Sequence, residues 1–199
     1  MDLRLVFATH NDHKAKEIQS IMPNGVHILS LDDIGCDEEI PETGSTLEEN
    51  ALIKARYVFQ NYGLNCFADD TGLEIDELDG EPGVFSARYA GPDKDANANM
   101  KKVLEKLGGT QNREARFKTS IALILHGEEH LFDGTVDGRI TYEAKGNGGF
   151  GYDPIFEPEN HGRTFAEMSL EEKNTMSHRA RAIEKLVHFL IKDNYTHRL

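Results

Sequence analysis

The spacing of apolar residues changes along this chain, and each change marks a predicted helix or strand. Leu3–Ala8 is a short apolar run followed by polar residues, which is typical of a buried strand. Apolar residues then recur at helical spacing from Lys14 to Met22, until Pro23 stops the pattern. Val26–Leu31 is apolar again. These three segments predict a β-α-β unit, whose crossover is almost always right-handed.

Three further helices are predicted from apolar stripes that begin at capping residues. Ser45 or Thr46 precedes the first of these helices, with a glutamate three residues further on, and Gly63 follows its last turn. The second stripe covers Asp95–Leu107, and the last helix begins near Ser177. The sequence therefore predicts helices distributed along the whole chain.

The remaining apolar segments are predicted as strands. Cys66–Asp69 is a short strand that runs into a turn over residues 69–72. Arg116–Leu125 and Glu129–Ile140 form a predicted hairpin around Gly127. Some neighbouring strands have no helix between them, so the expected fold is α/β with a mixed sheet rather than a purely parallel one.

Length and charge limit the classes of protein that this chain can belong to. Its 199 residues fit one domain, with room for two lobes. It carries 22 Lys and Arg against 35 Asp and Glu, a net charge of −13. This balance argues against a general nucleic-acid-binding protein, which needs a basic face to displace counterions from phosphates. Acidic clusters can still hold a divalent cation that reverses the local charge for a phosphorylated ligand.

Cysteine usage and the lengths of the apolar runs predict a cytoplasmic protein without membrane contact. Cys36 and Cys66 lie far apart and outside any CxxC spacing, which fits a reducing cytosol better than a disulfide framework. The apolar run Leu5–Ala8 is too short for a signal-peptide core. The longest aliphatic stretch, Ile121–Leu125, cannot span a bilayer.

A polar segment directly after the first strand is a candidate phosphate site, because ligands in open α/β sheets usually bind where a strand ends. The start of the following helix offers free N–H groups and a partial positive charge. An ordinary polar turn with a solvated lysine is the alternative interpretation. The segment consists of Thr9, His10, Asn11, Asp12, His13 and Lys14.

Carboxylates form the second candidate cluster. Glu42, Asp69 and Asp70 each lie at a predicted element end. Mg²⁺ prefers oxygen ligands, typically one or two carboxylates together with substrate phosphates and water. A turn stabilised by an Asx hydrogen bond is the alternative interpretation of the aspartate pair.

The third candidate is the glycine-rich segment 146–154, in which Phe150 and Tyr152 are the only large side chains. Glycines open backbone conformations that other residues rarely adopt, and an aromatic ring on such a loop can stack on a nucleobase. The alternative is a hairpin loop whose aromatic residues fold back onto the core.

A fourth candidate follows near the last helix, where Lys173 precedes Ser177, His178 and Arg179. Cations in a first helical turn oppose the helix dipole, which marks them as candidates for ligand contact.

Six ordered segments resemble the inosine triphosphate pyrophosphatase family, the noncanonical purine nucleoside triphosphate pyrophosphatases. The likeness spans essentially the whole chain, which makes it far more specific than any single short motif. The segments are Thr9–Lys14, Pro41–Gly44 followed by Glu49–Ala51 and Lys54–Ala55, Ala68–Gly72, Pro82–Tyr89, Gly148–Pro154 and Ser177–Arg179.

This resemblance implies a fold, an activity and partners. The expected fold is a single two-lobed domain over residues 1–199, with an elongated mixed sheet, flanking helices and a nucleotide cleft between the lobes. The expected reaction is Mg²⁺-dependent hydrolysis of ITP, dITP and XTP to the monophosphate and pyrophosphate, which would cleanse the nucleotide pool. A homodimer that binds neither nucleic acid nor membrane is expected.

The resemblance also implies roles for the candidate residues. The segment Thr9–Lys14 would hold the phosphates, Glu42 and Asp70 the metal, and Asp70 would also act as the base. Thr71 would touch the substrate. The base and ribose pocket would be lined by Phe150, Gly151, Tyr152, Asp153, Lys173, His178 and Arg179.

Two other functions share part of this pattern. A regulatory module that binds a purine nucleotide without turnover would need the glycine loop and Phe150, but not Glu42 and Asp70 together. A pyrophosphatase for ordinary or modified pyrimidine nucleotides would need a different base pocket. An assay of pyrophosphate release over several nucleotides, with and without Mg²⁺, separates the three.

Overall fold

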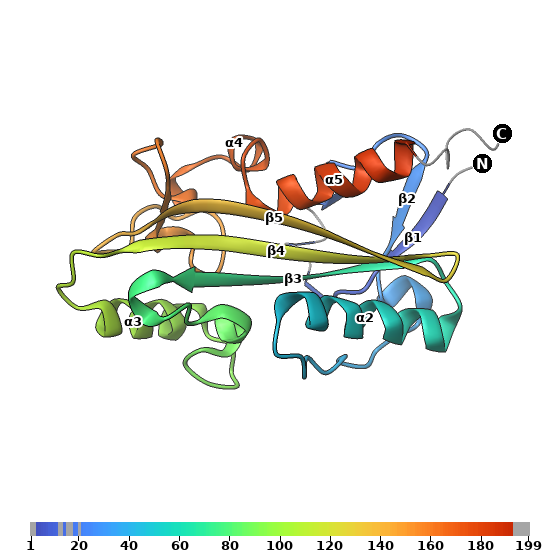
Figure 1. The fold of residues 1–199 in the computed structure, drawn as a ribbon, viewed down its shortest axis with the longest axis horizontal. Helices are drawn as coiled ribbons and strands as arrows, with labels where there is room; N and C mark the ends of the chain where they lie inside the picture. Colours follow the sequence, from blue (N-terminus) through green and yellow to red (C-terminus); the bar gives the residue numbers. More distant parts are fainter. Residues whose placement is uncertain (1–2, 12–13, 15–17, 20, 193–199) are drawn as a thin grey trace. The chain divides into compact units, whose positions relative to one another are not determined.

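The computed structural model describes residues 3–11, 14, 18–19 and 21–192, and its strands form one mixed sheet (Figure 1). The strand order is β2-β1-β3-β4-β5-β6. β1 pairs in parallel with β2 and β3, whereas β5 and β6 are antiparallel, so the predicted mixed sheet with flanking helices is confirmed. The strands are β1 (Leu3–Phe7), β2 (Val26–Leu29), β3 (Cys66–Ile75), β4 (Glu114–Leu125), β5 (Glu128–Ile140) and β6 (Phe156–Pro158).

The helices predicted at Thr46, Asp95 and Ser177 begin where the sequence indicated, whereas the short helix Leu170–Asn174 was not predicted. The hydroxyl of Thr46 accepts the backbone N–H of Glu49, and the Glu49 carboxylate accepts the N–H of Ser45. Gly63 then ends the helix at a φ of 66°, in the left-handed region that glycine favours. In the part of the chain that the structure describes, the helices include α2 (Leu47–Tyr62), α3 (Ala96–Leu107), α4 (Leu170–Asn174) and α5 (His178–Lys192).

Two predicted elements are described only in part or differ from the prediction. Of the helix expected from Lys14 to Met22, Lys14, Ile18 and Gln19 are helical, and several other positions lie outside the described residues. The turn expected at residues 69–72 is wrong, because β3 continues through them to Ile75. The apolar residues Leu73 and Ile75 are fully buried, and this burial carries the strand past the two aspartates.

The chain divides into two compact units, each built from separate segments. Unit 1 comprises Met1–Asp70, Thr119–Gly134 and Arg179–Leu199, and unit 2 comprises Thr71–Lys118 and Thr135–His178. That the two units act as the lobes of a single domain stays a prediction.

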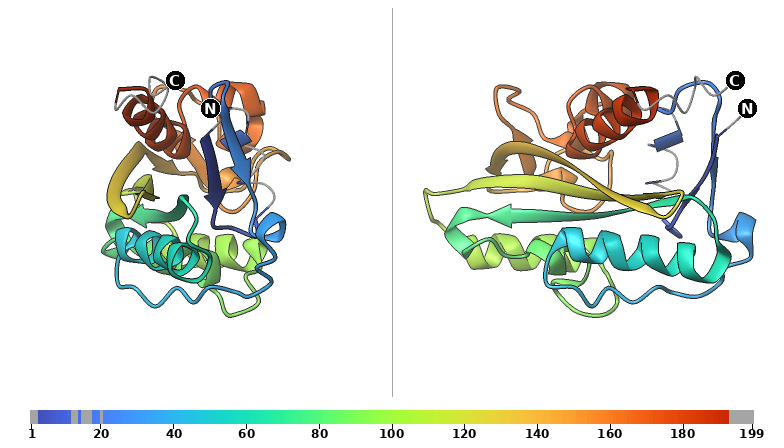
Figure 2. Two further views of the ribbon diagram at one scale, coloured as in Figure 1. Left: turned by 90° about the vertical axis from the view of Figure 1, so that its right-hand side faces the viewer. Right: turned by 45° about the vertical axis from the view of Figure 1, so that its right-hand side comes forward.

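In unit 1, helices pack on both faces of the sheet. Side chains alternate between the two faces of a strand, so neighbouring residues of β1 and β3 belong to different cores. Phe7 and Phe67 stack on each other in the core that includes Ile183 and Leu186 of α5. Ala8 and Ala68 belong instead to a core with Ala51, Ala55 and Val58 of α2. The parallel pair β1 and β2 lies side by side in both views of Figure 2.

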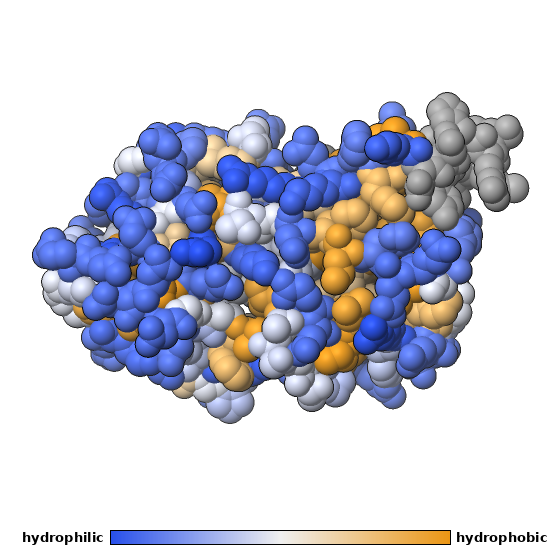
Figure 3. Space-filling view, in the orientation of Figure 1, coloured by the Kyte–Doolittle hydropathy of each residue, from blue (hydrophilic) through white to orange (hydrophobic). Residues whose placement is uncertain are grey.

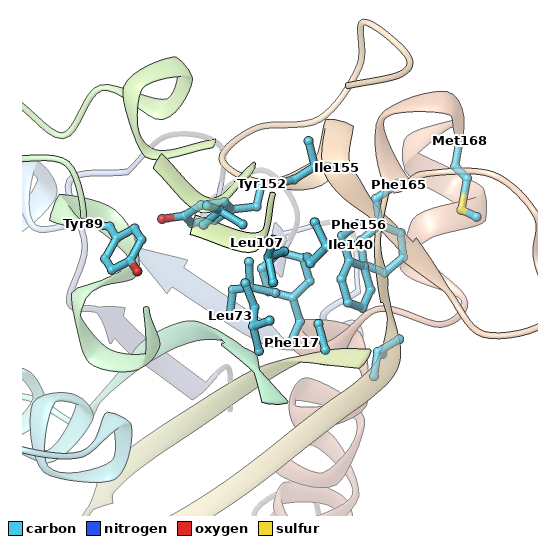
Figure 4. Close-up of a cluster of buried hydrophobic side chains, with 14 residues drawn as sticks. Leu73, Tyr89, Leu107, Phe117, Ile140, Tyr152, Ile155, Phe156, Phe165 and Met168 are labelled. Atoms are coloured by element: carbon cyan, nitrogen blue, oxygen red, sulfur yellow. The ribbon is translucent and has the colours of Figure 1, made fainter. Parts of the chain in front are cut away.

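Unit 2 has its own aromatic core. Phe117, Phe156 and Phe165 pack ring against ring, with centroids 4.6 to 6.1 Å apart. Tyr152 from the glycine-rich segment joins this core (Figure 4), and its hydroxyl donates to the carbonyl of Ser86 at 2.8 Å. The segment that carries the candidate base site is therefore anchored in the core of unit 2.

One face of the molecule is covered mainly by polar side chains, with some apolar areas between them (Figure 3). The face shown in Figure 3 is largely hydrophilic, as the excess of acidic residues leads one to expect. No helix among the described residues is both long and apolar enough to cross a membrane.

Candidate active site

The two adjacent aspartates of β3 take part in different clusters, because successive side chains of a strand point to opposite faces. Phe67 and Asp69 share one face, on which Phe67 packs against α5. Ala68 and Asp70 share the other face, on which Ala68 packs against α2. Because residues 69–72 form part of a strand and not the predicted turn, the two carboxylates lie on opposite faces of the sheet.

Asp69 holds two cations, one on each carboxylate oxygen. Its Oδ1 accepts from Nζ of Lys14 at 2.9 Å, and its Oδ2 accepts from Nε of Arg179 at 3.1 Å. Asp69 and Arg179 are each 1% exposed. Burial acts to raise the pKa of Asp69, but Lys14 and Arg179 outweigh it and hold this pKa well below its usual range. Burial lowers the pKa of Lys14, and Asp69 opposes that shift. The carboxylate is ionised at neutral pH and fixes two cations.

Asp70 faces α2, where three polar groups converge. Its Oδ2 accepts from Nδ2 of the fully buried Asn50 at 2.9 Å. Nζ of Lys54 lies 3.8 Å from its Oδ1 and donates to Oε1 of Glu42 at 2.6 Å. The Oδ1 of Asn50 accepts the N–H of Gly44 at 2.8 Å, so one amide joins the Glu42 loop to Asp70.

The pKa values in this second cluster follow from burial and from the neighbouring charges. Burial raises the pKa of Asp70, and the nearby Glu42 adds to the rise, while Lys54 and Asn50 oppose it. For Lys54, burial would lower the pKa, but the carboxylates of Asp70 and Glu42 raise it. The ammonium of Lys54 allows two like-charged carboxylates to lie close together.

The carboxylates of Glu42 and Asp70 fit the ligand preference of Mg²⁺. Both carboxylates lie near the ammonium group of Lys54, which shows that a positive charge fits between them. No group of three or more His, Cys, Asp and Glu in the described part of the chain could hold a metal ion. Mg²⁺ commonly takes one or two carboxylates from a protein and completes its shell with substrate phosphates and water, which matches this pair.

The predicted phosphate loop is partly described. The hydroxyl of Thr9 accepts the N–H of Asn11, whose side-chain oxygen accepts the N–H of Lys14, the bond pattern of a helix N-cap. The Nε2 atom of His10 lies 3.1 Å from the carbonyl oxygen of Glu38. Asp12 and His13 lie outside the described residues. The loop therefore joins the Asp69 cluster through Lys14.

The glycine-rich segment of unit 2 is tied together by one carboxylate. Oδ2 of Asp153 accepts both the N–H of Phe150 at 2.8 Å and Nζ of Lys173 at 2.9 Å. Nζ of Lys173 also lies 4.7 Å from the centroid of the Phe150 ring. Phe150 is half-buried, whereas Asp153 and Lys173 are each 3% exposed. The structure thus brings these three predicted residues together.

The other predicted base-site residues take varied positions. Tyr152 is buried in the core, so for this side chain the alternative of an aromatic folded back onto the core applies. Gly151 is half-buried beside it, and Thr71 is half-buried in β3. The ring of His178 stacks on Phe117 with centroids 4.7 Å apart. The boundary between the units falls directly after His178, and Arg179 belongs with Asp69 in unit 1.

Sequence reasoning assigned no role to Asn50 and Lys54, and no specific role to Asp69. A signal for the first two was present. Asn50 and Lys54 are spaced four apart and adjoin Ala51 and Ala55, which form the buried stripe of α2. Polar residues on the buried face of a helix need partners, and here the partners are Glu42 and Asp70.

The fold and the two clusters define an α/β protein with one site rich in paired charges and a second site built around an aromatic ring. The sequence profile of the Ham1 family matches residues 5–189. The chain belongs to the Ham1 family, and the resemblance inferred from its motifs is confirmed.

Individual relatives agree over nearly the whole chain. The dITP/XTP pyrophosphatase of Flavobacterium johnsoniae is 55% identical over 188 residues, which cover 94% of this chain and 98% of that protein. The solved Ham1 protein of Staphylococcus aureus is 40% identical, with a TM-score of 0.88 and coverage of 96% and 99%. The solved HAM1 protein of Coxiella burnetii is 39% identical, with a TM-score of 0.89 and the same coverage.

Proposed function

We propose that this chain hydrolyses noncanonical purine nucleoside triphosphates, namely dITP, XTP and ITP, to the nucleoside monophosphate and pyrophosphate. Membership of the Ham1 family supports this reaction, as do its relatives that are named dITP/XTP pyrophosphatase. The observation that carries the proposal is that the two adjacent aspartates of β3 bind different partners on opposite faces of the strand. Asp69 fixes the cations Lys14 and Arg179, while Asp70, on the opposite face, lies with Glu42 and Lys54.

The reaction breaks the bond between the α-phosphorus and the oxygen that bridges it to the β-phosphorus. The oxygen of a water molecule attacks the α-phosphorus, and Asp70, as the carboxylate beside the attacking water, accepts its proton. Pyrophosphate departs with the bridging oxygen. Lys14 and Arg179, held by Asp69, balance the negative charge of the phosphates. Glu42 and Asp70 would hold Mg²⁺, which would neutralise triphosphate charge when bound.

Base recognition is assigned to unit 2. Phe150 provides a stacking surface for a purine, and His178 provides a side-chain donor for a 6-oxo group, which ATP lacks. The ion pair of Arg179 with Asp69 favours His178 over Arg179 as this donor. Thr71 and Gly151 remain predicted substrate contacts. For Tyr152 the predicted contact is limited to its backbone, because its side chain is buried in the core.

One experiment tests the proposed reaction. Pyrophosphate release is measured with ITP, dITP, XTP, GTP, ATP and dUTP, in Mg²⁺ and after its removal with EDTA. We expect release from the first three nucleotides well above the others, and its loss in EDTA. Tight binding of ITP without release would instead favour a regulatory module, and preferred release from dUTP would favour a pyrimidine nucleotide pyrophosphatase.

The assembly and location follow as further parts of the proposal. A homodimer in the cytoplasm fits the acidic, cysteine-poor composition and the family resemblance. Sedimentation velocity of the purified chain at micromolar concentration tests the dimer, because a single species of monomer mass would contradict it.

A further inference from the structure

We propose that Asp153 is a positioning residue, which fixes the ring of Phe150 and the ammonium of Lys173 as one unit and acts on the base only through them. This inference rests on the proposed function, since it takes Phe150 as the surface on which the base stacks. It assigns Asp153 a different role from the direct substrate contact that the sequence resemblance implied.

The carboxylate of Asp153 is committed to the loop itself. A single oxygen, Oδ2, accepts from the amide of Phe150 and from Nζ of Lys173 at 2.8 and 2.9 Å. The backbone N–H of Asp153 in turn donates to the carbonyl of Phe150 at 3.2 Å. Residues 150 and 153 are therefore joined twice, and this closes the loop and sets the backbone from which the Phe150 ring extends.

Lys173, which is bound to Asp153, also contacts the ring of Phe150. Its N–H donates to the carbonyl of Ser169, the N-cap of α4, which fixes its backbone in a short helix. Its ammonium lies 4.7 Å from the Phe150 centroid and 5.6 Å from that of Phe165. A cation is attracted to the face of an aromatic ring, so the ammonium of Lys173 takes one face of Phe150. The other face is then available for the base to stack on.

The loop glycines fit this arrangement rather than a flexible loop. Gly149 has a φ of +71°, and a Cβ placed there would lie 2.8 Å from Cβ of Asp153. Gly146 has a φ of +84°, and its added Cβ would lie 2.7 Å from the backbone nitrogen of Glu167. Side chains at either position would push the loop away from its supports. The glycines allow the loop to close over the Asp153 carboxylate.

Stability alone is a weak reason for this buried pair. Removing a carboxylate and an ammonium from water is costly, and well-packed apolar residues are often as stabilising as a buried ion pair. Asp153 and Lys173 are both almost fully buried, so this cost applies to each. A role in placing the ring explains why the pair occurs at this loop.

The chain contains no tryptophan, so Phe150→Trp introduces a single fluorophore at the stacking position. Its emission is followed while inosine monophosphate is titrated, first in this variant and then with Asp153→Ala or Asp153→Asn added. We expect the nucleotide to quench the introduced indole. Asp153→Ala should shift the emission to the red and weaken binding at least tenfold. Asp153→Asn retains an oxygen that can accept the amide of residue 150, and it should restore most of the affinity.

Kinetics of the same substitutions on the natural Phe150 background separate positioning from chemistry. Asp153→Ala should raise KM for ITP at least tenfold and leave kcat within about threefold. Glu157→Gln is the matched control, because Glu157 also pairs with a cation in unit 2, through Nη2 of Arg139 at 2.7 Å, but lies outside the loop. It should change neither KM nor, when added to Phe150→Trp, the indole emission. Lys173→Met, which keeps Asp153, should give a smaller rise in KM of the same kind.

The outcomes distinguish this inference from the proposed function. If inosine monophosphate leaves the emission of Phe150→Trp unchanged with Asp153 intact, base stacking on residue 150 is wrong and the inference is overturned with it. If quenching occurs but Asp153→Ala leaves affinity and emission unchanged, only the positioning role is overturned. A fall in kcat as large as the rise in KM overturns it as well. Should Asp153→Ala fail to fold, Lys173→Met decides: a rise in KM for ITP without an equal fall in kcat supports the positioning role, and an unchanged KM overturns it.

Discussion

In the proposed function, the charged cluster of unit 1 and the aromatic cluster of unit 2 would bind different parts of a nucleotide by different physical means. Unit 1 gathers the carboxylates of Glu42, Asp69 and Asp70 with the cations Lys14, Lys54 and Arg179. The aromatic cluster of unit 2 consists of the Asp153–Lys173 ion pair, the ring of Phe150 beside that ammonium, and the ring of His178. Triphosphates are the same in every nucleotide, whereas bases differ. The rate is therefore expected to depend on unit 1 and the choice of nucleotide on unit 2.

The positions of the key side chains support this division. Asp69 and Asp70 belong to a strand that is buried on both faces, so their partners are fixed by the packing of α5 and α2. Phe150 and Lys173 belong to a loop and a short helix whose geometry depends on a single carboxylate. Substitutions in unit 1 should therefore affect all nucleotides alike, and substitutions in unit 2 should affect them unequally or through affinity.

The largest expected effect is that of Asp70→Asn. An asparagine can still accept from Asn50, so the fold should persist, but it cannot accept the proton of the attacking water. Loss of a general base typically costs on the order of 10²–10⁴-fold in rate, and we expect about 10³-fold in kcat for ITP and XTP alike. Pyrophosphate release and thermal unfolding check both parts. Near-normal turnover at saturating Mg²⁺ would remove Asp70 from the mechanism.

The next largest effect is expected for Lys54→Met, which removes the ammonium between Glu42 and Asp70. The two carboxylates would lose the cation that orders them, and kcat should fall on the order of 10²-fold for every substrate. The Mg²⁺ concentration for half-maximal activity should also fall, since no ammonium competes for the carboxylates. Lys101→Met, at an exposed lysine paired with Glu105, is the control. Equal losses in both variants would argue against a specific role for Lys54.

The sequence was sufficient for the elements whose signals are local. Caps and glycine stops located α2 and α3, and Gly127 located the hairpin. It failed at residues 69–72, where Asp-Asp-Thr-Gly has the composition of a turn. Burial of Leu73 and Ile75 overrides that local preference and keeps the chain extended. Tertiary packing decided this element, and packing has no signal in the four residues themselves.

The candidate site shows the same division between what is local and what is not. The residue types in each cluster could be selected from the sequence, because phosphates need cations and Mg²⁺ needs carboxylates. Which of these residues bind one another could not be predicted from the sequence. Arg179 is next to His178 in sequence, yet its partner is Asp69, 110 residues away. Asn50 carries no chemistry of its own and matters only because folding places it between Gly44 and Asp70.

Discrimination between bases should be altered by His178→Ala. If this ring donates to a 6-oxo group, its loss should reduce kcat/KM for ITP more than for ATP. Leaving a buried 6-oxo group without its donor costs roughly 1–3 kcal/mol, so the ratio of kcat/KM for ITP to that for ATP should narrow on the order of 10–100-fold. His188→Ala, at an exposed histidine on the same helix, is the control. An equal loss for ITP and ATP would place His178 in the fold rather than in base selection.

The smallest expected effect is that of Phe150→Ala, and it bears most directly on how the units differ. Stacking is worth about 1–3 kcal/mol per base and does not depend strongly on which base is stacked. KM should therefore rise about tenfold for ITP, XTP and ATP alike, while kcat for ITP changes little, because the unit 1 cluster remains intact. This pattern differs from that of Asp70→Asn, which lowers kcat, and from that of His178→Ala, which changes the ratio between bases. Measuring all three variants with the same nucleotides distinguishes an effect on kcat, an effect on KM and an effect on the preference between bases. An unchanged KM in Phe150→Ala would mean that Phe150 is a structural residue, and the affinity of unit 2 for the base would then have to come from other side chains such as His178.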